Sequence, residues 1–97
     1  MDRGRIAQAL YKIQDPELGA DIVNLGLIYD IAKTGSIWVI TMTLTYPGCP
    51  LIDVFREQIE RALAKDLGLK KFELKFTFSP PWIPAMIDPD LRIALSV

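Results

Sequence analysis

The fold of this chain is decided by residues 36–45, which read SIWVITMTLT. Large apolar side chains alternate there with threonines and a valine. Because successive side chains of a β-strand point to opposite faces, the alternation predicts a strand with one strongly apolar face. Such a strand suits a sheet that is covered mainly on one side. We expect the covered face to carry Trp38, Ile40, Met42 and Leu44, and the open face to carry Val39, Thr41, Thr43 and Thr45.

An amphipathic helix is expected after this strand, over about residues 50–67. Glu57 and Arg61 have the i,i+4 spacing of an ion pair on its exposed side, and Gly68 is placed to end it. Its apolar face is predicted from a repeat of four residues, at Leu51, Phe55, Ile59, Leu63 and Leu67, with Ile52 and Ala62 alongside.

Two further strands flank this unit. Residues 27–33 precede it, and Thr34 and Gly35 supply a hairpin turn between the first two strands. Residues 71–78 follow it, with phenylalanines and a leucine alternating with polar residues.

Both ends of the chain carry helix signals. Apolar residues at helical spacing predict a helix over residues 2–13, with Asp2 as its N-cap and an end near residue 14 set by Pro16. Near the other end, Asp88 and Pro89 are typical of a helix start, so we expect a short helix over about residues 88–95. An edge strand over residues 93–97 is the alternative.

The predicted order is therefore α-β-β-α-β-α. The hairpin makes the first two strands antiparallel, and the helical crossover makes the second and third parallel. We predict an α+β fold, a two-layer α/β domain in which helices cover mainly one face of a mixed three-stranded sheet. A length of 97 residues allows one domain, residues 1–97.

Composition excludes several classes of function. The formal net charge is -1, whereas a sequence-independent nucleic-acid binder carries a basic excess. No apolar run resembles a signal peptide or a membrane span, so we expect a cytoplasmic protein with neither nucleic acid nor membrane as a partner. The chain has one cysteine and no histidine, which excludes zinc fingers, Cys–His nucleophile pairs and an internal disulfide.

Cys49 is the most informative residue for function. Pro50 behind it is favoured in the first turn of a helix, so Cys49 is expected to be the N-cap. A side chain there faces unpaired N–H groups and the positive end of the helix dipole, and both favour the thiolate that binds soft metals. A lone cysteine is also commonly a small buried apolar residue. We favour the functional interpretation because Pro47 and Pro50 bracket the turn.

The turn Asp15-Pro16-Glu17 is a second candidate. Its two carboxylates flank a proline of fixed φ and are able to supply oxygen ligands or a base. A helix-ending turn, in which Asp15 accepts local backbone hydrogen bonds, explains the same residues.

Three other positions carry weaker signals. Thr43 and Thr45 approach Cys49 and are able to donate hydrogen bonds to a thiolate or a sulfide, although β-branched residues on an open sheet face explain them more simply. Pro81 and Trp82, in the run Pro80-Pro81-Trp82, form either a partner-recognition surface or a lid on the core.

Four motifs together resemble a known family. They are Asp15-Pro16-Glu17, DIVNLGLI at residues 21–28, MTLT leading to PGCP within residues 42–50, and Pro80-Pro81-Trp82. In this order they resemble the MIP-type iron–sulfur assembly domain family, which includes SufT-like proteins, the targeting subunit of cytosolic iron–sulfur assembly, and PaaD-like proteins of phenylacetate degradation. Residues 1–97 contain neither the cysteine-rich segment of the PaaD-like proteins nor the P-loop of relatives fused to an ATPase, so we expect the chain to resemble the SufT-like branch more closely.

The resemblance implies a maturation factor that carries iron–sulfur clusters or delivers them to apo-proteins, with Cys49 reactive and Asp15 and Glu17 beside it. A cluster takes about four ligands, so one cysteine does not suffice. We therefore expect a transient cluster held between subunits, and as partners apo iron–sulfur proteins, other cluster-assembly proteins and a second copy of the chain. The alternative is a non-enzymatic, PaaD-like adaptor supporting a multicomponent oxygenase, with Cys49 structural or regulatory. A thiol enzyme ranks last, because no complete catalytic constellation is visible.

Overall fold

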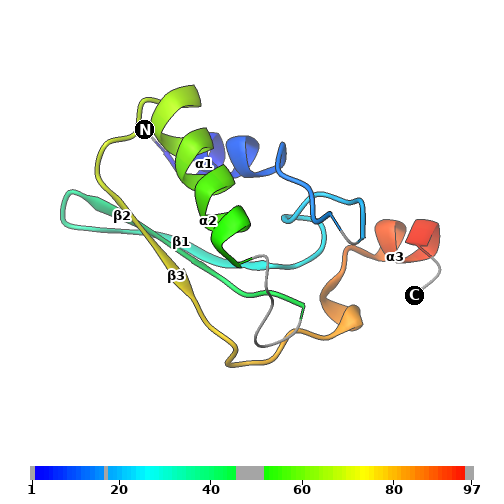
Figure 1. Ribbon diagram of the computed structural model, residues 1–97. Helices are drawn as coiled ribbons and strands as arrows, with labels where there is room; N and C mark the ends of the chain where they lie inside the picture. The colour runs from blue at the N-terminus through cyan, green and yellow to red at the C-terminus, as the bar shows by residue number, and fades with distance from the viewer. Residues whose placement is uncertain (1, 17, 46–51, 96–97) are drawn as a thin grey trace.

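The computed structural model describes residues 2–16, 18–45 and 52–95. Within them the elements follow the predicted order, with two short helical turns added (Figure 1). The elements are α1 (Arg3–Leu10), β1 (Ile28–Thr34), β2 (Ile37–Met42), α2 (Ile52–Arg61), the π-helical turn η1 (Ala62–Asp66), β3 (Phe72–Phe76), the 3-10 turn η2 (Pro84–Met86) and α3 (Pro89–Leu95).

The three strands form one mixed sheet, as the sequence predicts. β2 lies in the centre, in the order β1-β2-β3. β1 runs antiparallel to β2, with Ile31 opposite Ile40, and β3 runs parallel to β2, with Leu74 beside Ile40. The crossover through α2 therefore has the geometry that parallel neighbours require.

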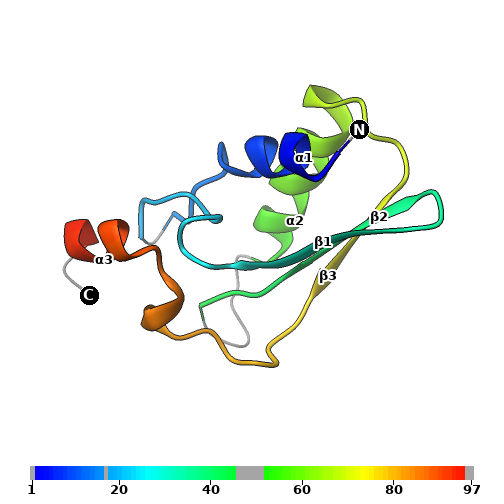
Figure 2. The same ribbon diagram turned by 180° about the vertical axis from the view of Figure 1, so that it is seen from behind.

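Both long helices cover the same face of this sheet. Figures 1 and 2 show α1 and α2 together on one side, with α3 beyond the end of the sheet opposite the β1–β2 hairpin. The predicted two-layer α+β fold is thus confirmed. The core gathers the buried side chains of the central strand and of both helices, among them Ile6, Leu10, Trp38, Ile40, Met42, Leu44, Phe55, Ile59 and Leu63.

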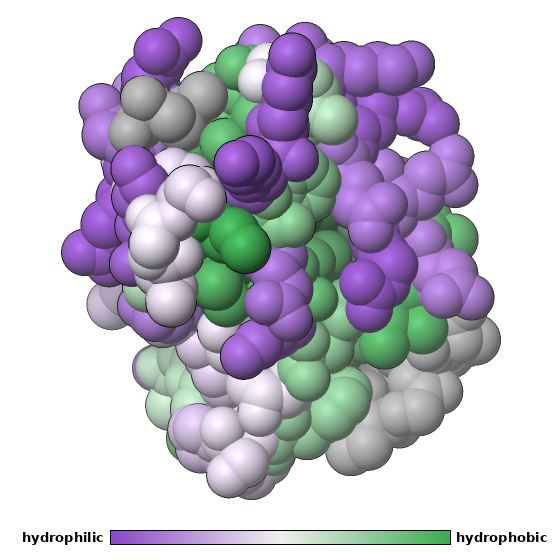
Figure 3. Space-filling view, turned by 90° about the vertical axis from the view of Figure 1, so that its left-hand side faces the viewer, coloured by the Kyte–Doolittle hydropathy of each residue, from purple (hydrophilic) through white to green (hydrophobic). Residues whose placement is uncertain are grey.

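At the hairpin end of the molecule, hydrophilic side chains surround the apolar ones (Figure 3). The ammonium group of Lys33 lies 5.9 Å from the centre of the Trp38 ring, within the range of a cation–π interaction. Lys33 thus covers part of the Trp38 ring, while apolar side chains such as Ile37 also reach the surface at this end.

The first helix ends earlier than predicted, at Leu10 instead of residue 13. Asp2 is its N-cap, as expected, and accepts a hydrogen bond from the N–H of Arg5 at 2.9 Å. The N–H of Ile13 donates to the carbonyl of Leu10 in a tighter turn, and the carbonyl of Ile13 accepts from Ile22. The α-helix thus ends in two hydrogen bonds to carbonyls three residues back, and Ile13 then pairs with a later segment that periodicity does not reveal.

The other boundaries differ by smaller amounts. β2 ends at Met42 instead of residue 45, and β1 and β3 lie within two residues of the predicted bounds. The second helix changes from α to π at Ala62, and Gly68, at φ +67°, follows its end as predicted. The expected helix start at residues 50 and 51 lies outside the described residues.

The last segment is a helix and not an edge strand. The carboxylate of Asp88 accepts hydrogen bonds from the N–H groups of Asp90 and Leu91, at 3.2 and 3.3 Å. This is the N-cap that Asp88 and Pro89 predict.

Candidate functional site

Asp15 closes a tight turn after α1. Its side chain is buried, and its Oδ1 accepts a hydrogen bond from the N–H of Leu18 at 3.2 Å. Its backbone N–H donates to Ala20 at 2.9 Å, and its carbonyl accepts from Gly19 at 2.7 Å. The local backbone hydrogen bonds that a helix-ending turn predicts for Asp15 are therefore present. They also hold a carboxylate in one position, which a ligand or a base requires.

A second loop, residues 21–27, follows this turn and leads into β1. Asp21 organises it: Oδ2 accepts from the N–H of Asn24 at 2.8 Å, and Oδ1 accepts from the Asn24 side-chain amide at 2.9 Å. Leu25 and Leu27 are fully buried beneath the loop. Sequence reasoning missed the Asp21–Asn24 pair, which the i,i+3 spacing of these two residues could have indicated.

This loop explains the position of Thr43. The N–H of Thr43 donates to the carbonyl of Leu27 at 2.8 Å, so the loop packs beside the end of β2. Thr43 is fully buried as a result, and the prediction that it lies on an open sheet face is wrong. Its hydroxyl donates to the carbonyl of Leu44 at 3.4 Å. Thr45 is half-buried.

Trp82 links the segment after β3 to the loop of residues 21–27. Its indole Nε1–H donates to the carbonyl of Leu25 at 2.7 Å, and its ring packs against the core. Nearby, the hydroxyl of Tyr29 donates to the carbonyl of Pro80 at 2.8 Å. These contacts are those expected of a lid on the core, and the partner-recognition role of Pro81 and Trp82 stays a prediction.

Gly26 is a further position that sequence reasoning did not single out for function. It has a φ of +77°, and a Cβ placed there would overlap the carbonyl oxygen of Met86. The backbone of the loop of residues 21–27 therefore approaches the backbone of the turn η2 at Gly26, and only glycine permits this close approach. The signal in the sequence is a glycine inside an apolar run.

These parts gather at one end of the sheet. In Figures 1 and 2 the turn after α1, the end of β2 and the start of α2 all lie away from the β1–β2 hairpin. Cys49 and Glu17 lie outside the described residues, so their predicted places in this site stay predictions. Thr45 and Ile52 are the described residues on either side of the segment that contains Cys49.

Within the described ranges, no group of three or more His, Cys, Asp or Glu side chains is placed to hold a metal ion. None of the helices described there is long and apolar enough to cross a membrane.

The sequence of residues 3–73 matches the family described as "Iron-sulfur cluster assembly protein". The match spans well over half of the chain, and the chain therefore belongs to this family, as its motifs predict.

Named relatives agree with this assignment. The chain is 41% identical over 93 residues to the Fe-S protein maturation auxiliary factor YitW of Bacillus subtilis, covering 95% of this chain and 91% of that protein. It is 39% identical to the Fe-S protein maturation auxiliary factor SufT of Staphylococcus aureus, covering 86% and 96%. It is also 31% identical to a putative component of the 1,2-phenylacetyl-CoA epoxidase of Escherichia coli, covering 86% of this chain and half of that one.

The fold is shared with solved structures. A domain of unknown function from Bacillus anthracis superposes with a TM-score of 0.88 at 34% sequence identity, covering 97% of this chain and 91% of that one.

Proposed function

We propose that this protein is an iron–sulfur cluster maturation factor that holds a cluster transiently through Cys49 and passes it to apo-proteins. Membership of the iron–sulfur cluster assembly family carries this proposal. The names of its similar relatives, both maturation auxiliary factors, support it.

The geometry of the described residues is compatible with one site. Asp15 is held by backbone hydrogen bonds in the turn after α1, and Figure 1 shows this turn on the side of the molecule away from the β1–β2 hairpin. In the proposal Cys49 supplies the thiolate, and Asp15 and Glu17 supply nearby carboxylates. Thr43 and Thr45 lie at the end of the strand that precedes Cys49 and position the loop rather than bind the cluster.

Because one chain supplies too few ligands, the cluster in this proposal is shared between two chains or with a partner. One cysteine and no histidine cannot satisfy the irons of a cluster, and carboxylates match its soft sulfide-bridged irons poorly. Two copies related by a two-fold axis, or one copy with a thiol-bearing partner, bring two thiolates together. Because separation of the two chains releases the cluster, this arrangement suits delivery to apo-proteins and exchange with other assembly proteins.

The proposal describes a carrier and not an enzyme, acting in the cytoplasm, where reducing conditions keep a lone thiol available. The second candidate is an adaptor that docks apo-proteins without binding a cluster. The similarity to an epoxidase component favours it.

Anaerobic reconstitution with iron and sulfide distinguishes a cluster carrier from an adaptor that binds no cluster. We expect the wild type, but not Cys49→Ala, to gain the visible absorbance of a bound cluster. Native mass spectrometry should then find the cluster's mass on dimers or on complexes with an added thiol. Circular dichroism of Cys49→Ala checks that the variant is folded.

Two results would refute the carrier. One is a folded wild type that gains no cluster, and the other is a Cys49→Ala protein that gains as much as the wild type. A monomer that holds two irons and two sulfides without added thiol would refute the shared site.

A further inference from the structure

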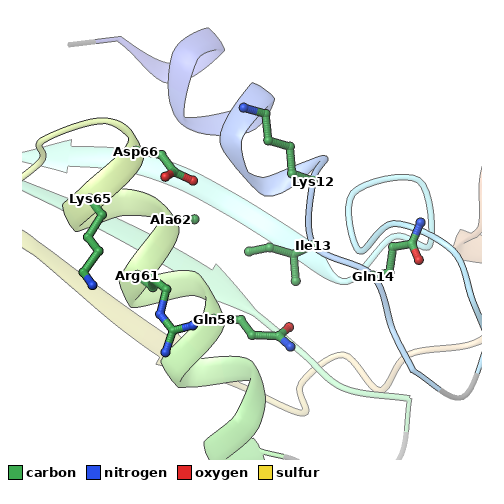
Figure 4. Close-up of a pocket in the computed structure, with 8 residues that line it drawn as sticks. All are labelled: Lys12, Ile13, Gln14, Gln58, Arg61, Ala62, Lys65 and Asp66. Carbon is green, nitrogen blue, oxygen red and sulfur yellow. The ribbon is translucent and has the colours of Figure 1, made fainter.

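A groove of about 430 Å³ lies between the end of α1 and the face of α2 and η1. Its volume falls within the range of about 300–1,000 Å³ that is typical of ligand sites. Figure 4 shows Ile13 and Ala62 pointing toward each other across it. Both side chains are buried, so the floor of the groove is apolar.

Polar side chains stand along both walls of this groove. Figure 4 shows Gln58 and Asp66 reaching toward it from α2 and η1, with Lys12 and Gln14 on the α1 side. A glutamine amide has both donors and an acceptor, so it matches the N–H and carbonyl groups of an extended peptide.

The charge of the groove differs from that of the chain. Lys12, Arg61 and Lys65 line it against the single carboxylate of Asp66, which gives three positive charges minus one, or +2, on a protein of net charge -1. Arg61 also donates to Glu57 at 2.7 Å, but both side chains are well exposed, and such a surface pair contributes little. Arg61 can therefore exchange this partner for another carboxylate at small cost.

The helix dipoles argue against a compact anion such as phosphate. The groove lies beside the carboxyl end of α1 and the last turns of the second helix, where the dipole is negative. Backbone N–H groups at helix starts, which small anions prefer, are not part of this wall. The positive charge comes instead from long side chains, which can reach carboxylates spaced along a chain.

The π-helical turn η1 shapes this wall. It spans Ala62–Asp66, so two of the residues at its ends line the groove. Figure 4 shows Ala62 and Asp66 on the side of the helix that faces α1, whereas the long side chains of Arg61 and Lys65 extend from the outer edge of this wall. π-turns inside α-helices are frequent at functional sites.

We infer that this groove is a docking site for an acidic segment of a partner polypeptide. Carboxylates of the segment pair with Lys12, Arg61 and Lys65, and an apolar side chain packs over Ile13 and Ala62. The glutamine amides bind the backbone of the segment. The groove is lined by described residues, and the inference does not depend on cluster binding.

Fluorescence anisotropy with a labelled peptide tests the inference. The probe is a synthetic octapeptide of six glutamates and two leucines, and its control carries glutamine in place of every glutamate. We expect the wild type to bind the glutamate peptide and not its control. Lys12→Glu and Lys65→Glu should each weaken binding by about three- to tenfold, because each replaces an attraction by a repulsion.

Lys70→Glu is the matched control, because it makes the same change of charge at an exposed position outside the groove. It should leave the dissociation constant within about twofold of the wild type, since Lys70 is exposed, does not line the groove and is screened by physiological salt. Thermal melting of all three variants shows whether they are folded.

Three outcomes would overturn the inference. The first is equal weakening by Lys70→Glu and Lys65→Glu, which would mean attraction by net charge alone. The second is equal binding of the glutamine peptide. The third is displacement of the peptide by inorganic phosphate at the peptide's own concentration, which would mean a compact anion site. Cluster reconstitution of Lys12→Glu is expected to equal that of the wild type, so a failure here is distinct from a failure of the carrier.

Discussion

Replacing Gly26 by alanine perturbs the contact between the loop of residues 21–27 and the turn η2. The backbone at Gly26 has a φ of +77°, and an added Cβ would lie 2.9 Å from the carbonyl carbon of Met86 and closer still to its oxygen. The obstacle is backbone and not the end of a flexible side chain. Relief therefore requires η2 to move away, and η2 is joined through Ile83 to Trp82 and its hydrogen bond to Leu25.

The loss in free energy of unfolding expected for Gly26→Ala has two parts. Holding an L-residue in the left-handed region costs about 1–2 kcal/mol, and overpacking a close contact costs about 1–3 kcal/mol. Together they predict a loss of about 2–5 kcal/mol in the free energy of unfolding. Gly35→Ala is the matched control, because Gly35 has a φ of +63° and nothing within 4 Å of an added Cβ. It should show the first part alone.

Urea denaturation followed by circular dichroism measures both variants. For a domain of this size, each kcal/mol should lower Tm by about 4–8 °C. Equal destabilisation of Gly26→Ala and Gly35→Ala would refute the reasoning. It would show that η2 moves away from the added Cβ with no loss in the free energy of unfolding.

Three other predictions follow from named contacts. Trp82→Phe keeps an aromatic ring but removes the donor to the Leu25 carbonyl, so urea denaturation should show a loss of about 0.5–1.5 kcal/mol; no loss would mean that water replaces the indole. Ile40→Ala empties the centre of the sheet, where Ile40 is fully buried, and should cost about 2–5 kcal/mol, against about 0.5–1.5 for Ile40→Val; similar costs for the two would contradict this packing. Alkylation of Cys49 by iodoacetamide should reach half its maximal rate below pH 8.5, roughly the pKa of a free thiol, because the predicted helix start favours the thiolate; a midpoint at or above that pH would favour a structural role.

The sequence predicted the sheet well because its signals are local. Alternation in residues 36–45 placed Trp38, Ile40, Met42 and Leu44 on the buried face, and all four are buried. The order of elements and the parallel pairing of β2 with β3 follow from the helix between them.

What the sequence could not predict depends on contacts between distant residues. After α1, Ile13 pairs with Ile22, and Thr43 is buried where it pairs with Leu27. Neither partner can be found from periodicity, because periodicity describes one element at a time. The same holds for the groove, whose walls come from two helices far apart in the chain.

Strand β2 is complete in the growing chain well before its parallel neighbour exists. Phe72 follows Met42 by 30 positions, so at about 5–20 residues per second the ribosome needs roughly 2–6 s to reach it. The hairpin of β1 and β2, by contrast, forms within about 1–10 μs once both strands are free. During those seconds the second edge of β2 has unpaired backbone groups and no strand beside it, which is the state in which a nascent chain pairs with another or is bound by a chaperone.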